Sequence, residues 1–83
     1  MKEDILLKEI FNLLSSTHEP LETKEIEAKI IEMKLKEHST RTKVFYRLNI
    51  LRGDGKIKGK FVGPGKGVWI WWMESTFGKK AAN

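Results

Sequence analysis

Side chains that bind phosphate are concentrated between residues 39 and 73 of this 83-residue chain. The segment holds eight Lys or Arg and one acid, Asp54, for a net charge of +7, whereas residues 1–38 have a net charge of −3. A surface without a polyanionic partner usually mixes its charges, so this separation predicts a face that binds nucleic-acid phosphates. The alternative is a basic surface that has no such partner.

Signatures of enzymes and metal sites are weak. His18 and His38 lie twenty residues apart, with no Cys and no carboxylate at a recurrent ligand spacing, which argues against a metal site. The glycines of residues 63–67 do not have the spacing of a nucleotide-binding loop, and Ser39 has no neighbouring base to activate it. We therefore expect no catalytic residue, no metal and no cofactor.

Length and composition predict one small domain. A chain of this size buries only about 60% of the surface that its unfolded state exposes, which leaves little room for an enclosed active site. Cys is absent, acids interrupt the apolar run at the N-terminus, and no stretch approaches the roughly 20 apolar residues of a membrane span. We expect a cytoplasmic protein without a membrane partner.

A helix over about 40–53 is predicted to carry the phosphate-binding residues. Its apolar stripe consists of Val44, Leu48 and Leu51, and its opposite face of Thr42, Tyr46 and Asn49. Ser39 or Thr40 can cap the N-terminus, and the Gly-Asp-Gly run at 53–55 ends the helix. One face therefore belongs to the core, and the other faces outward.

Period-two alternation predicts a β-hairpin over 56–72, with a four-residue turn at 63–66 in which Gly65 takes a positive φ. The predicted cross-strand pairs are Phe61 with Val68, Gly59 with Ile70 and Ile57 with Trp72 on the core face, and Lys60 with Trp69 and Lys58 with Trp71 on the outer face. The outer pairs would place lysine over tryptophan, a cation–π arrangement.

Two further helices precede this segment. The first is predicted over about 3–14, with a core stripe of Leu6, Ile10 and Leu13 widened by further apolar residues. The second is predicted over about 23–34, with Thr23 as N-cap and with Ile26, Ile30 and Met33 in the core. A turn at 34–38 then leads to the third helix.

This order, a helix, a helix-turn-helix pair and a hairpin with a Gly-rich tip, resembles the winged helix-turn-helix superfamily. The resemblance implies an α+β fold for residues 1–73, with a two-stranded wing, an optional third strand at Leu21-Glu22 and a tail over 74–83. It also implies a small transcription regulator of the bacterial and archaeal type, which places its third helix in the major groove of duplex DNA.

The candidate nucleic-acid-binding residues follow from this resemblance and from the charge pattern. They are Ser39, Thr40, Arg41, Thr42, Lys43, Tyr46, Arg47, Asn49, Lys58, Lys60 and Lys66. Thr42, Lys43 and Tyr46 are expected to reach the bases, and Arg41 and Arg47 to clamp phosphates. Asn49, a turn further along, is expected to reach only the backbone.

Trp69 and Trp71 leave three alternatives open. They are packed inside the protein, they form a dimer contact, or they stack on unpaired bases. A homodimer through the first helix or through the tryptophan face is therefore possible. The alternative functions are a winged-helix module that binds proteins, and a single-strand-binding accessory protein of replication or RNA metabolism that uses the Trp/Lys hairpin.

Overall fold

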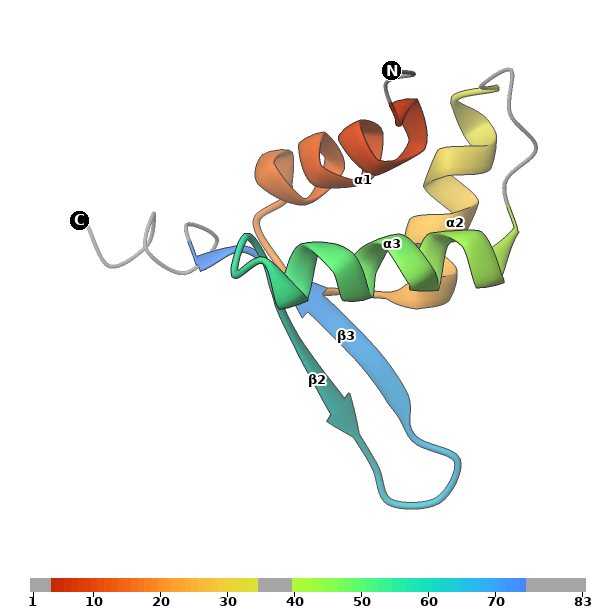
Figure 1. Cartoon of the computed structure of the whole chain (residues 1–83). Helices are drawn as coiled ribbons and strands as arrows, with labels where there is room; N and C mark the ends of the chain where they lie inside the picture. The colour runs from red at the N-terminus through yellow and green to blue at the C-terminus, as the bar shows by residue number, and fades with distance from the viewer. Residues whose placement is uncertain (1–3, 35–39, 75–83) are drawn as a thin grey trace.

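The computed structural model describes residues 4–34 and 40–74, which form an α+β fold. The elements in these residues are α1 (Ile5–Ser16), β1 (Leu21–Glu22), α2 (Thr23–Glu32), α3 (Arg41–Gly53), β2 (Lys58–Val62) and β3 (Val68–Trp72). The strands form an antiparallel sheet in the order β1-β3-β2. The helices pack together, and β2 and β3 extend past α3 as a hairpin (Figure 1). The predicted fold class is confirmed, including the third strand, and the arrangement is compatible with a winged helix.

α1 begins two residues later than predicted because Asp4 caps it. The Asp4 carboxylate accepts a hydrogen bond from the Leu7 N–H at 2.9 Å, which satisfies one of the donors left free at a helix start. The buried residues are Leu6, Ile10 and Leu14. Leu13, which was predicted to lie in the core stripe, is only half-buried, and the helix continues to Ser16.

α2 is capped differently from the prediction. Glu22, rather than Thr23, is the N-cap, and it forms a reciprocal capping box with Glu25. The Thr23 hydroxyl instead accepts a hydrogen bond from the indole N–H of Trp71 at 2.8 Å. Ile26 and Ile30 are buried as predicted, but Met33 is exposed because the helix ends at Glu32, before the next inward position.

α3 matches its prediction closely. Thr40 is the N-cap, and its hydroxyl accepts a hydrogen bond from the Lys43 N–H at 3.2 Å. The buried residues are Val44, Leu48 and Leu51, the predicted stripe. Asp54 follows as the C-cap, and Gly55 takes a positive φ of 76°. Ser39 and most of the predicted turn at 34–38 lie outside the described residues, as does the tail beyond Glu74.

The predicted hairpin register is wrong by one residue. Val62 pairs with Val68, so the connection is the five residues 63–67 and not the four residues 63–66. Gly65 has the expected positive φ of 78°, and Gly67 has one of 62° that the prediction did not include. Because side chains alternate along a strand, a slip of one residue gives each side chain a partner from the other face of the facing strand. Trp69 and Trp71 therefore share a face with Phe61 and Gly59, and not with the lysines of β2.

The corrected register places Trp71 in the core. Trp71 lies opposite Gly59, and its side chain is fully buried. A Cβ atom at residue 59 would lie 2.6 Å from the Trp71 ring, so only glycine leaves room for the indole here. β1 covers the other edge of β3 through the pair Leu21 and Trp71. The hairpin is thereby anchored to the helices by one large side chain.

Candidate nucleic-acid interface

The outward face of α3 carries exposed polar and aromatic side chains. Burial of the core stripe fixes the rotation of the helix, so Thr42, Lys43 and Tyr46 point to solvent. Tyr46 is 64% exposed, so its ring is not packed inside the domain. Asn49 is exposed as well, and its amide donates a hydrogen bond to the Phe45 carbonyl at 2.9 Å.

Arg41, at the first position of α3, is held by α2. Its Nε donates a hydrogen bond to Oε1 of Glu27 at 2.9 Å, and its side chain remains 63% exposed. An exposed ion pair contributes little to stability, so the guanidinium can be given up to a stronger anion such as a phosphate. Arg41 therefore remains a candidate phosphate contact.

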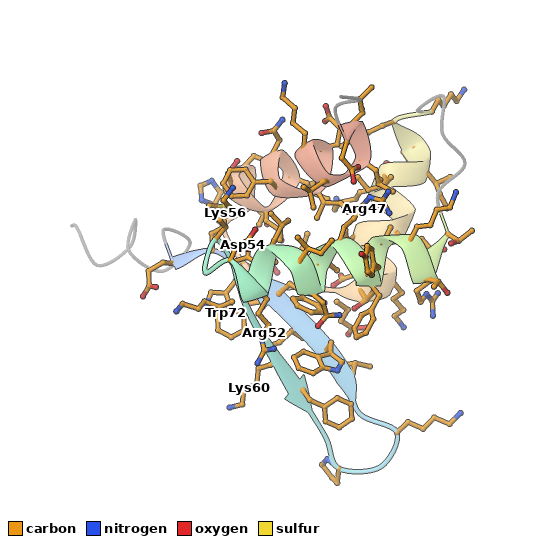
Figure 2. The ribbon with its side chains drawn as sticks, viewed as in Figure 1. Arg47, Arg52, Asp54, Lys56, Lys60 and Trp72 are labelled. Carbon is orange, nitrogen blue, oxygen red and sulfur yellow. The ribbon has the colours of Figure 1, made fainter. Side chains whose placement is uncertain are left out.

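Arg47 is not positioned as a phosphate clamp. Its Nε lies 3.0 Å from Oδ1 of Asp4, its Nη1 donates to the Lys43 carbonyl at 3.1 Å, and its side chain is only 16% exposed. Figure 2 shows it on the side of α3 that faces α1. The prediction failed because the partner, Asp4, lies 43 residues earlier in the chain. Arg47 joins α3 to the start of α1 and is removed from the candidate interface.

The Asp4–Arg47 contact also affects the pKa of Asp4. Partial burial raises the pKa of Asp4, but the Leu7 N–H and the Arg47 guanidinium outweigh it and hold the pKa below its ordinary value of 3.8. The carboxylate is therefore charged at neutral pH and caps α1 while it pairs with α3.

The hairpin lysines are exposed, but they do not cover Trp69 and Trp71 as predicted. Lys58 lies opposite Trp72, and Lys60 lies opposite Ile70. Lys58 also approaches Oε1 of Glu74 at 3.6 Å in an exposed pair. Lys60 projects away from the hairpin in Figure 2. Lys66 lies in the exposed connection at the tip. The three lysines are thus available to a polyanion along the hairpin.

The opposite face of the hairpin forms an aromatic row with α3. The Trp69 and Trp71 rings are stacked, with centroids 5.2 Å apart and an interplanar angle of 19°. Phe45 meets both tryptophans edge to face, and Phe61 meets Trp69 in the same way at 6.1 Å. Because Trp71 is fully buried, it can be neither a dimer contact nor a stacking platform; Trp69 is half-buried.

Arg52 closes one end of this row. Its guanidinium carbon lies 5.3 Å from the centroid of the Trp69 ring, which is a cation–π contact. In Figure 2, Arg52 extends from α3 to the hairpin, on the side opposite to Arg47. The cation–π contact expected from lysines on the hairpin is thus supplied by an arginine of α3.

An open groove of about 440 Å³ lies between the N-terminal turns of α2 and α3 and the hairpin. We call it the aromatic groove. Its apolar wall consists of Phe45, Phe61, Val68 and Trp69. Its polar side includes Lys24, Arg41 and Thr42, together with Glu22, which lies 3.8 Å from Lys24. Its volume falls within the range of ligand sites in proteins.

Phe45, Phe61, Arg52 and Lys24 were not among the predicted site residues. Phe61 was expected to pair with Val68, whereas it pairs with Trp69, because the hairpin connection is one residue longer than predicted. Gly59 is the signal that could have corrected this, since a glycine inside a strand next to three tryptophans is explained when a large ring lies across from it. Arg52 and Lys24 had no comparable signal.

Residues 4–34 and 40–74 have neither a metal-binding cluster nor a membrane-spanning helix. In these residues no group of three or more His, Cys, Asp or Glu could hold a metal ion. No helix among them is both long and apolar enough to span a bilayer.

Comparison with protein-family models, with curated proteins and with solved structures finds no match to this chain.

Proposed function

We propose that this chain is a winged helix-turn-helix protein that binds duplex DNA in the cytoplasm and acts as a small transcription regulator. The observation that carries the proposal is the outward face of α3, whose first turns expose Thr42, Lys43 and Tyr46. The hairpin projects beside this helix (Figure 1), and it carries exposed lysines. A helix with an exposed hydrogen-bonding face fits the major groove, which is wide enough to admit it.

The residues divide into two roles. Thr42 and Tyr46 contact base edges, because they lie furthest from the core stripe. Arg41 and Lys66 contact phosphates. Lys43, which was expected at the bases, joins them because it lies next to the buried Val44, at the edge of the outward face. Phosphate contacts set the position of the protein on the duplex without reading its sequence. The protein would act by occlusion or recruitment at a promoter, with no catalytic step.

A homodimer through α1 remains part of the proposal, and one through the tryptophan face does not. Ile5 on α1 and Ile31 on α2 are 56% and 54% exposed, which leaves apolar surface outside the core. The tryptophan face is largely occupied by its own domain, since Trp71 is buried. The same burial removes Trp71 from the surface that a protein-binding module would use.

The test is the salt dependence of binding to a random-sequence duplex. Binding that releases counterions from roughly five or six phosphates gives a log–log slope of about −4 to −6. Lys43→Ala and Lys66→Ala should each weaken binding and reduce the slope by about 0.9. Lys29→Ala is the matched control, because it removes an exposed lysine from α2 rather than from the proposed interface.

Two results would contradict the proposal. If Lys43→Ala, Lys66→Ala and Lys29→Ala bind the duplex with the same affinity and slope, α3 and the hairpin are not the interface. If the parent protein does not bind duplex DNA at low salt, the positive charge of residues 39–73 has another role.

A further inference from the structure

We propose that the aromatic groove receives unpaired nucleobases of the bound DNA, so that a duplex with a single-stranded end binds more tightly than a blunt duplex. The inference rests on the proposed function, because the duplex is the ligand that brings the unpaired strand to the groove.

Phe61 is the ring best placed to stack on a base. It is 54% exposed, although it belongs to the same row as the buried Trp71. Its ring lies over Gly67, where an added Cβ would come within 2.3 Å of it, and it meets Trp69 edge to face. The platform is therefore held in place before any ligand binds, which lowers the entropic cost of binding.

The groove has an apolar wall on one side and cations on the other. Phe45 and Trp69 continue the apolar wall from α3 and β3, while Lys24 and Arg41 stand on the polar side, 64% and 63% exposed. Proteins that bind single strands stack the bases on aromatic rings and place the phosphates near cations. Glu22 and Glu27 pair with these cations, so phosphates must compete with two carboxylates.

The groove is continuous with the proposed duplex site. Arg41 and Thr42 line the groove and also begin the outward face of α3. Lys66, next to Gly67 at the hairpin tip, has no ion-pair partner among the described residues and adds a positive charge beside the groove. A strand that leaves a duplex seated on α3 thus reaches the groove directly. An apolar peptide would pack against the rings but would bring no anion to these cations.

The experiment compares three DNAs that share one duplex of about 16 base pairs, long enough to cover the interface. The first is blunt, the second carries a tail of about four unpaired thymines, and the third carries an abasic tail of the same length. The abasic tail adds the same phosphates without bases, so it separates stacking from charge. Affinities of the full chain are measured at one salt concentration by anisotropy of labelled DNA.

We expect the thymine tail to raise affinity at least fivefold over the blunt duplex, and the abasic tail to raise it less than twofold. Phe61→Ala should abolish the advantage of the thymine tail and leave blunt-duplex affinity within twofold. Val62→Ala is the matched control, because residue 62 is the next in the strand, is also exposed and lies on the other face of the hairpin. It should retain the advantage.

Equal affinity for the blunt and thymine-tailed duplexes overturns the inference, as does equal affinity for the two tails or an unchanged preference in Phe61→Ala. Another result would show that the proposed function is wrong while this inference holds. If the blunt duplex is not bound but a thymine single strand is, in a manner that depends on Phe61, the duplex proposal fails and the base-binding groove stands. If none of the DNAs binds, both proposals fail.

Discussion

The two flanks of α3 carry similar side chains and use them differently. On the flank that faces α1, Arg47 is largely buried and its guanidinium contacts the Asp4 carboxylate at 3.0 Å. On the flank that faces the hairpin, Arg52 lies over the Trp69 ring and Phe45 lines the aromatic groove. Figure 2 shows the two arginines on opposite sides of the helix. One flank fastens the helix to the domain, and the other leaves a groove open to solvent.

The difference shows that a basic residue on a candidate binding helix is not automatically available to a ligand. Arg47 and Lys43 lie one turn apart, yet the Arg47 side chain is largely buried against α1 while Lys43 is exposed. Charge counts identify the helix, whereas packing decides which of its charges meet a partner. The comparison can be tested by removing the anchors of each flank in turn.

The largest effect is expected at Trp71, the buried anchor of the hairpin flank. Trp71→Ala should lower the free energy of unfolding by about 3–5 kcal/mol, because it empties a core position and leaves the Thr23 hydroxyl without its donor. Trp71→Phe, which keeps a ring, should lose less. Denaturant unfolding measures both variants.

Trp72→Ala is the control, since residue 72 is half-buried and lies on the other face of β3. Its cost should be less than half that of Trp71→Ala. Equal costs would contradict the corrected register, which places only Trp71 under Gly59.

A smaller loss is expected at Asp4, the anchor of the α1 flank. Asp4→Ala removes both the N-cap of α1 and the contact with Arg47, and it should lower the free energy of unfolding by about 1–2 kcal/mol. Asp4→Asn keeps a capping side chain and should lose less. Duplex affinity should stay within twofold in both variants; a large loss would place this flank in the interface.

The stability of the α1 flank should also depend on pH. The pKa of Asp4 in the folded protein lies below its ordinary value of 3.8, so its contribution is present above that value and is lost as the pH falls through the lowered pKa. The free energy of unfolding is measured as the pH is lowered from about 5 in steps of about one unit. The parent protein should lose more stability over this series than Asp4→Asn. Parallel pH profiles of the two proteins would contradict the ion pair.

The smallest effect is expected at Arg52. Arg52→Ala removes an exposed cation from the Trp69 ring and should cost about 0.5–1 kcal/mol. Arg52→Lys keeps the charge and should recover part of the loss. The intrinsic tryptophan fluorescence, to which Trp69 contributes, should change in both variants. Unchanged emission together with unchanged stability would argue against the contact.

Local features of the chain were predictable, and distant contacts were not. The stripe Val44, Leu48 and Leu51 and the Thr40 cap depend on neighbours within four residues, so α3 was predicted almost to the residue. The predicted hairpin connection was one residue too short, because the glycines of 63–67 permit connections of four or five residues. That slip gave Phe61 the wrong partner and assigned Trp69 and Trp71 to the outer face.

The engagement of Arg47 could not be predicted for a different reason. Its position, three residues after Val44 and four before Leu51, places it at the edge of the buried stripe. Its partner comes from the start of another helix, which only the tertiary structure brings near. The same applies to the pairing of Trp71 with the Thr23 hydroxyl across 48 residues. The outward residues Thr42 and Tyr46 were identified correctly as exposed because the buried stripe alone fixes them.

The most direct test of the central proposal is to map amide chemical shifts of the labelled protein as a duplex is added. We predict that shifts concentrate at Thr42, Lys43 and Tyr46 on α3 and at Lys66 on the hairpin tip, with the amides of α1 nearly unchanged. Shifts concentrated on α1 and on the C-terminal turn of α2, with α3 unaffected, would contradict it and would move the interface to the opposite side of the domain.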